Sequence, residues 1–272
     1  MKTNVLCIST AVLLLLASAS QGFSVEIIAH RGASFDAPEN SLSSFKLGYR
    51  QNADGDELDI YQTKDGRIVV SHDANTLRTG GVSNLISAMT YEQLRGVDVG
   101  KWGKWAGKEF AEPLPTLEQV LPLIPDGKKL FIEIKCGVEV LPELDRVLKK
   151  SGKNASQLVL IGFGFEVVKA AKKLMPQHQV YWLVSGDKKK NLYPTPEELI
   201  TKAKDAGLEG VNLDWGFPID AAFSKQIHDA GLKLYTWTVD DPKVAQRLSA
   251  AGVDGITTNR PQWLRDQLAV VP

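Results

Sequence analysis

Titratable residues are concentrated between positions 27 and 73 of the 272-residue chain. His30 and His72 are two of its four histidines, and Glu57 and Asp59 lie between them. Residues two apart on an extended strand point to the same side, so the two carboxylates are expected to share one face. Imidazoles titrate near neutral pH, and a pair of them can take and give protons on opposite sides of one reacting centre. We therefore interpret this stretch as half of an active site.

A divalent cation would explain why acidic residues gather there. Two neighbouring carboxylates repel each other and raise each other's pKa unless a cation lies between them. Glu133, near the end of a later predicted strand, is placed to join Glu57 and Asp59 as a third oxygen ligand. A site made of carboxylates and water favours Mg²⁺ or Ca²⁺ over zinc. Each residue taken singly fits a solvated edge equally well, with Lys135 or Arg31 as an ordinary ion-pair partner.

The tripeptide His30-Arg31-Gly32 closes the first predicted strand. The planar guanidinium of Arg31 suits bidentate contact with a phosphate or a carboxylate. His178 and His228 fall in a predicted loop and a predicted helix, and we assign them no role.

These side chains need strands that end at one place. Strand patterns alternate with helical patterns, which implies a parallel sheet with helices outside it. Eight such units fit a (β/α)8 TIM barrel, whose chemistry belongs at the carboxyl ends of the strands. An open doubly wound sheet is the alternative, although no G-x-G-x-x-G follows the first strand. The predicted strands are 25–29, 56–61, 129–135, 158–162, 179–184, 210–213, 233–239 and 255–257, and a hairpin adds 68–70.

The sequence also predicts two local features. Residues 74–114 lose the pattern over a length that predicts an inserted subdomain after the second strand, with Trp102 and Trp105 in a packed loop. The first helix is expected to begin at a cap supplied by Asn40 or Ser41.

Composition limits the partners and the compartment. With 43% apolar residues, 24% charged residues and a formal net charge of +0, the chain is typical of a soluble globular protein without a nucleic-acid partner. Residues 1–20 read as a signal peptide, so we expect an exported protein, periplasmic or secreted, with its barrel domain over 25–272. Only Cys136 then remains, which excludes an internal disulfide.

Seven short motifs together resemble the glycerophosphodiester phosphodiesterases. They run in the order of that family across nearly the whole of the expected mature chain: His30-Arg31-Gly32, Pro38-Glu39-Asn40, Glu57-x-Asp59, Asp65-Gly66 with His72-Asp73, Pro115-Thr116-Leu117-Glu118, Glu133-Ile134-Lys135 and Thr236-Trp237-Thr238-Val239. One departure is Asp56, where the family usually carries an aliphatic residue.

The resemblance implies a fold, a reaction and a set of residue roles. It implies a TIM barrel with a small subdomain after the second strand, which hydrolyses glycerophosphodiesters to glycerol 3-phosphate and an alcohol. The roles that it implies are one divalent ion on Glu57, Asp59 and Glu133, an acid-base pair in His30 and His72, phosphate binding by Arg31 and Lys135, and an apolar wall at Trp237. Within the pair we expect His30 to be the base and His72 the acid, with the reverse assignment open.

Two other functions remain as alternatives. A lysophospholipase D or phosphatidylinositol-cleaving phospholipase would share the barrel, and only then is contact with a membrane expected; Trp102, Trp105 and Phe110 would supply its apolar mouth. A non-catalytic exported protein that binds a phosphoester would retain its ligand without turnover.

Overall fold

The computed structural model describes residues 25–187 and 189–269, so the predicted signal peptide lies outside the described residues. Its parallel strands form a ring in the order β1-β9-β8-β7-β6-β5-β4-β2, which a pairing between β1 and β2 closes. This closed ring confirms the predicted barrel and excludes the open sheet. The strands are β1 (Glu26–Ala29), β2 (Gly55–Gln62), β4 (Lys129–Ile134), β5 (Leu158–Gly162), β6 (Gln179–Val184), β7 (Gly210–Asp214), β8 (Lys233–Trp237) and β9 (Gly255–Thr258).

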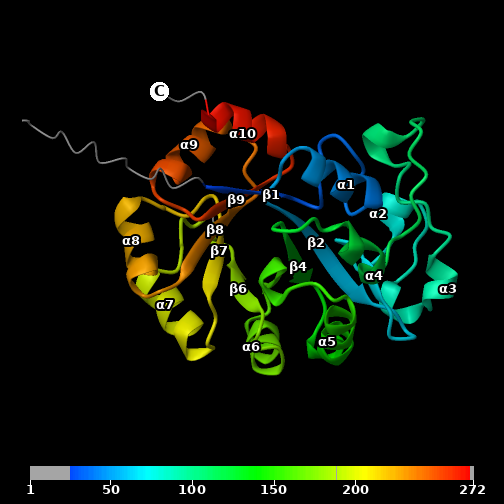
Figure 1. The fold of residues 1–272 in the computed structure, drawn as a ribbon, viewed down its shortest axis with the longest axis horizontal. Coiled ribbons are helices and arrows are strands. Elements are labelled where there is room, and N and C mark those ends of the chain that lie inside the picture. The colour runs from blue at the N-terminus through cyan, green and yellow to red at the C-terminus, as the bar shows by residue number, and fades with distance from the viewer. Residues whose placement is uncertain (1–24, 188, 270–272) are drawn as a thin grey trace, which may run out of the picture.

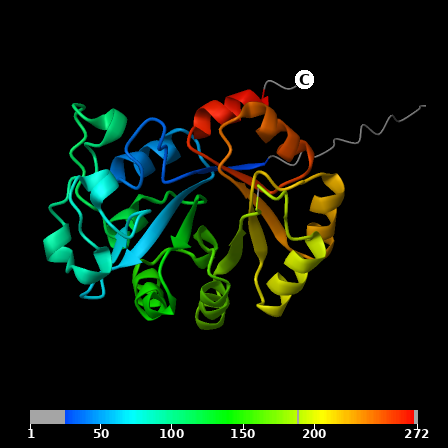
Figure 2. The same ribbon diagram turned by 180° about the vertical axis from the view of Figure 1, so that it is seen from behind.

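Helices cover the outside of the ring (Figure 1), and the view from behind shows the same arrangement (Figure 2). The alternation of side chains along each strand explains this layering. In β2, Leu58 and Ile60 belong to the large apolar core between strands and helices, so Glu57 and Asp59 face the barrel interior. The covering helices are α1 (Leu42–Arg50), α5 (Leu141–Lys150), α6 (Phe165–Leu174), α7 (Pro196–Asp205), α8 (Ala221–Asp229), α9 (Pro242–Ala250) and α10 (Pro261–Ala269).

The predicted hairpin is confirmed at the end of β2. β3 (Ile68–Val70) pairs antiparallel with the last residues of β2, and Ile60 lies opposite Val70. Gly66 in the connecting turn has a φ of 82°, a left-handed conformation that glycine adopts without strain. The hairpin carries the chain back to the barrel mouth, where His72 follows two residues after β3.

Residues 74–114 lie to one side of the barrel (Figure 1) and contain only short helices. An apolar cluster, which includes Val69 of β3 and Leu94, packs this segment against the hairpin. Trp105 is buried and packs edge-to-face on Phe110, with ring centroids 5.3 Å apart. The limits of a subdomain here stay a prediction. The short helices of this segment are α2 (Leu77–Gly80), η1 (Ile86–Ala88), α3 (Tyr91–Leu94) and η2 (Gly103–Trp105).

The remaining one-turn helices lie between the second strand and the fifth. They are α4 (Leu117–Val120), η3 (Leu121–Leu123), η4 (Val138–Val140) and η5 (Ala155–Gln157). Over the described residues, every helix is too short or too polar to span a bilayer.

Aromatic side chains fill the lower interior of the barrel. Phe131, Tyr181 and Tyr235 contact one another with ring centroids 5.2 to 6.2 Å apart. The Tyr235 hydroxyl donates to Glu26, which also pairs with Lys129. This packed floor leaves polar side chains only the upper part of the barrel in which to form a site.

Candidate active site

A cavity of about 170 Å³ opens at the carboxyl ends of the strands. Seven of the eight predicted site residues line it, and the eighth, Asp59, is buried beside them. The barrel thus brings together residues that lie far apart in the sequence. The lining residues are His30, Arg31, Glu57, His72, Glu133, Lys135, Ile161, Phe163, Leu183, Asn212, Trp237, Thr238 and Thr257.

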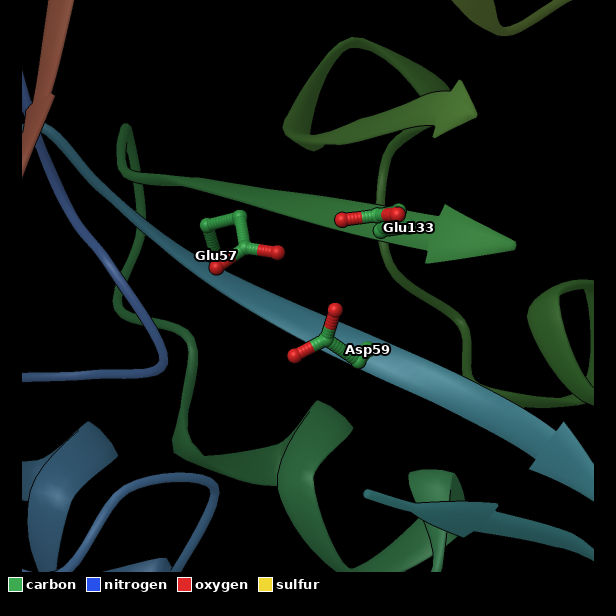
Figure 3. A group of neighbouring side chains, drawn as sticks. All are labelled: Glu57, Asp59 and Glu133. Atoms are coloured by element: carbon green, nitrogen blue, oxygen red, sulfur yellow. The ribbon is translucent and has the colours of Figure 1, made fainter. Parts of the chain in front are cut away.

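Three carboxylates meet at the acidic side of this cavity. Strand register places Asp59 directly opposite Glu133, and Glu57 precedes Asp59 on the same face of β2. One oxygen of each carboxylate lies within 4.8 Å of the others. Figure 3 shows the three side chains converging from β2 and β4. All three are buried, so water screens their mutual repulsion only weakly.

The electrostatics of the cluster suit the binding of a cation. Burial raises the pKa of Glu133 to about 7, with repulsion from Asp59 adding to the shift, and the pKa of Glu57 rises for the same two reasons. Burial also raises the pKa of Asp59, but the positive charges of Arg31 and Lys135 outweigh it and keep this carboxylate ionised. Three oxygen donors with excess buried negative charge are a ligand set that suits a hard divalent cation.

Arg31 occupies a left-handed turn after β1. Its φ is 56°, and its backbone N–H donates to Glu57 over 3.0 Å. Its guanidinium donates to Glu39 over 2.9 Å and lies 3.4 Å from Asp59. Gly32 follows with a φ of 76°, and a Cβ there would lie 2.4 Å from the backbone carbon of Ser44, so no other residue fits. The turn therefore points Arg31 into the acidic side of the cavity.

Lys135 neutralises the other side of the same cluster. Its ammonium lies 2.8 Å from a carboxylate oxygen of Glu133 and 3.5 Å from one of Asp59. Both predicted phosphate-binding cations are thus anchored to carboxylates while they line the cavity.

His30 is half-buried and oriented by an amide. Its Nδ1 lies 2.8 Å from the Oδ1 of Asn259. The side-chain amide of Asn259 donates to Asp240, so its oxygen faces His30, and Nδ1 must carry the proton. The other ring nitrogen, Nε2, therefore keeps its lone pair. Burial, with a smaller contribution from Arg31, lowers the pKa of His30 to about 4.

His72 is half-buried and oriented by a carboxylate. Its Nδ1 lies 2.7 Å from an oxygen of Asp73, which in turn accepts a hydrogen bond of 2.6 Å from Arg78. Partial burial raises the pKa of Asp73, but the hydrogen bonds from Arg78 and His72 lower it by more. An ionised carboxylate only accepts hydrogen bonds, so the Nδ1 of His72 carries the proton in this contact.

An apolar wall faces the charged side of the cavity. The indole N–H of Trp237 donates to the backbone oxygen of Asn212, and the ring of Trp237 packs edge-to-face on Phe163. The side-chain oxygen of Asn212 is buried and, among the described residues, has no hydrogen-bond partner. The wall therefore holds one unpaired acceptor that is buried next to the cavity.

Several supporting residues had no sequence signal that identified their role. Asp240 follows the last motif directly, Arg78 lies in the short helix α2, and Asn259 follows β9, but none of the three belongs to a motif. The expected helix cap is Ser41, whereas Asn40 has a φ of 56° and donates to Asp59 over 2.9 Å. Asn40 is therefore a partner of the acidic cluster.

The other two histidines lie outside the cavity. His178 is buried against the backbone oxygen of Leu158, and His228 pairs with Asp254.

Comparisons with known proteins relate most of the barrel to one family. A model described as the glycerophosphoryl diester phosphodiesterase family matches residues 30–263. A protein named glycerophosphodiester phosphodiesterase from Caldanaerobacter subterraneus subsp. tengcongensis is 33% identical over 244 residues, which cover 88% of this chain and 95% of that protein. A protein of the same name from Bacillus subtilis is 29% identical and covers 86% of this chain and 83% of its own length.

One solved structure adds a bound molecule to this comparison. It is an Oleispira antarctica phosphodiesterase in complex with the product sn-glycerol-3-phosphate. It superimposes with a TM-score of 0.80 at 27% identity, over 90% of this chain and 96% of that one.

Proposed function

This chain belongs to the glycerophosphoryl diester phosphodiesterase family, and from that premise we propose that it hydrolyses glycerophosphodiesters to glycerol 3-phosphate and an alcohol. The observation that carries the proposal is the single cavity in which two oriented histidines, two cations and a buried carboxylate cluster meet. The product bound to the Oleispira relative supports the same substrate class.

The partners of the two histidines suggest their roles. His30 faces a neutral amide and has a lowered pKa, so its free Nε2 suits a base that takes the proton of the nucleophile. That nucleophile is either water or the neighbouring hydroxyl of the substrate. His72 faces the carboxylate of Asp73, which accepts from Nδ1 and directs Nε2 to the cavity, so it suits the acid that protonates the departing alcohol. The reverse assignment remains the alternative.

The remaining charged residues suit the phosphate. Arg31 and Lys135 present positive charge to the cavity and would hold the phosphoryl oxygens. Glu57, Asp59 and Glu133 would hold one divalent cation, Mg²⁺ or Ca²⁺, which when bound stabilises the negative charge that grows on the phosphoryl group. Trp237 would pack against the glycerol or head group.

Histidine substitutions test this proposal. His30→Ala and His72→Ala should each lower kcat by about 10² to 10⁴, the usual contribution of a positioned acid or base. Divalent-cation binding and thermal unfolding should stay close to wild type. His228→Ala is the matched control, because that ring pairs with Asp254 outside the cavity. Near-normal turnover in both active-site variants would refute the assignment.

A lysophospholipase activity is favoured by one observation only. Phe163 lines the cavity with 42% of its surface exposed, which could accept part of an acyl chain. Against it, Trp105 is buried against Phe110 and does not widen an apolar mouth. Comparing turnover of glycerophosphocholine with that of lysophosphatidylcholine separates the two substrates. Retention of either compound without turnover would instead support the binding-protein alternative.

Export of the protein is a separate part of the proposal. It rests on the basic start, the apolar run and the small residues of positions 1–20. Expression of the full chain in a bacterium, followed by N-terminal sequencing of the exported protein, should find a mature end near Ala19 or Ser20. An unprocessed N-terminus in the cytoplasmic fraction would contradict it.

A further inference from the structure

Arg78, in α2 of the segment beside the barrel, contacts the partners of two different site residues. Its Nε donates to Asp73 over 2.6 Å. Its two terminal nitrogens donate to the two oxygens of Glu39, over 3.0 Å and 2.7 Å. The guanidinium also lies 5.0 Å from the ring centroid of Trp102, which restricts the plane that it adopts.

The two carboxylates that Arg78 holds each orient a residue of the cavity. Asp73 accepts from the Nδ1 of His72, and Glu39 accepts from Arg31. One oxygen of Glu39 thus receives hydrogen bonds from both arginines. Without Arg78, Asp73 and Glu39 would each lose a charged partner that fixes their side-chain rotamers.

We propose that Arg78 is a positioning residue of the active site, which fixes His72 through Asp73 and Arg31 through Glu39. The catalytic consequence rests on the proposed function, whereas the orientation of His72 does not. Only a guanidinium makes these three bonds at once, because its five donors lie in one rigid plane. The segment beside the barrel thereby supplies part of the catalytic arrangement.

Two substitutions at this position and one control test the effect on turnover. Arg78→Met keeps the length of the side chain without its donors, and Arg78→Lys keeps the charge on a single nitrogen. Both should lower kcat/KM by about 10- to 100-fold, as loss of an orienting partner does at other sites. Arg95→Met is the matched control, because Arg95 lies in the same segment in an exposed pair with Glu92, and it should keep wild-type turnover.

A spectroscopic measurement separates this inference from the proposed function. The ¹⁵N shifts of the neutral His72 ring, recorded at alkaline pH without substrate or metal, report which ring nitrogen keeps its proton. In the wild type we expect the proton on Nδ1, facing Asp73, and in Arg78→Met we expect a redistributed mixture.

The possible results distinguish a failure of the positioning role from a failure of the proposed function. Unchanged His72 shifts in a folded Arg78→Met protein would overturn the inference, as would full rescue of turnover by Arg78→Lys. A wild-type protein that turns over no diester would refute the proposed function instead, and a redistributed His72 spectrum in the variant would still support the positioning role.

Discussion

The two site histidines differ in the atom that each Nδ1 meets. His30 meets an amide oxygen that Asp240 holds in place, and His72 meets a carboxylate that Arg78 holds in place. Both oxygens accept from an Nδ1–H group, but only the carboxylate places a negative charge beside the ring. The proposed base and acid roles of the two rings therefore depend on Asp240 and Arg78, which hold the partners of the rings.

The position of Asn212 leads us to predict that the site prefers ligands with a glycerol hydroxyl. Asn212 lines the cavity beside Trp237, and its buried side-chain oxygen has no hydrogen-bond partner among the described residues, so we expect a hydroxyl of bound glycerol to donate to it. A buried acceptor left unpaired costs about 1–3 kcal/mol, so the wild type should prefer glycerol 3-phosphate to propyl phosphate by about tenfold. Asn212→Leu should remove that preference. Competitive inhibition constants for the two compounds measure it, and an unchanged ratio in the variant would contradict the assignment.

The raised pKa of Glu133 makes a prediction about cation binding. Burial and the charge of Asp59 bring it to about 7, so part of the metal-free protein carries a proton there at neutral pH. A carboxylate must lose its proton to bind a cation, so binding should release protons and strengthen as the pH rises through 7. Calorimetric titration in buffers of different ionisation enthalpy measures the release. Glu133→Gln should release fewer protons, and an enthalpy independent of the buffer in the wild type would contradict the prediction.

Within β2, Asp56 is an acidic residue on the strand face that otherwise carries the core residues Leu58 and Ile60. Asp56 points outward to α1, where it is fully buried, and neither carboxylate oxygen has a hydrogen-bond partner among the described residues. A Cβ on Gly48 would lie 2.1 Å from one of these oxygens, so the glycine leaves room for the carboxyl group. Burial, with a contribution from Glu57, raises the pKa of Asp56 well above its ordinary value.

This position makes a prediction about stability. Because the folded state holds a proton that the unfolded state loses, the contribution of Asp56 is present below its unfolded pKa of 3.8 and falls as the pH rises. Asp56→Val should therefore raise the free energy of unfolding by about 1–3 kcal/mol near neutral pH, and by less near pH 4. Denaturant unfolding across this range measures it, with Asp56→Asn as the variant that cannot titrate. A gain independent of pH would contradict the account.

At the scale of elements, short sequence patterns predicted the features that depend only on residues close together in the chain. Alternating apolar residues located the strands, the turn around Gly66 predicted the hairpin, and a spacing of two placed Glu57 and Asp59 on one face. Asn40 shows the limit: its side chain suits a helix cap, but a left-handed backbone turns it toward Asp59. Arg78 shows the same limit. One of its partners, Glu39, lies in the loop between β1 and α1, and the other, Asp73, follows the hairpin.

At the scale of the whole molecule, the sequence pattern alone left an open sheet as an alternative. What decides between sheet and barrel is the pairing of β1 with β2, where Ile28 lies opposite Gly55. Such a contact leaves no local trace in the sequence. The order of the family motifs supplied the missing information, because it fixes which strand ends carry the site.

Closure of the barrel also explains why the chemistry lies where it does. The aromatic floor of Phe131, Tyr181 and Tyr235 closes the lower interior, so the polar ends of the strands converge above it. Side chains from His30 to Thr257 thereby line one cavity that no single segment could form.

Turnover with and without a chelator tests the central claim most directly. The purified mature protein is incubated with a panel of glycerophosphodiesters, with added Mg²⁺ or Ca²⁺ and then with excess EDTA, and released glycerol 3-phosphate is quantified. We predict release from at least one diester, its loss with EDTA and its return when the divalent cation is restored. No release from any diester with either cation present, or an undiminished rate in EDTA, would contradict the account.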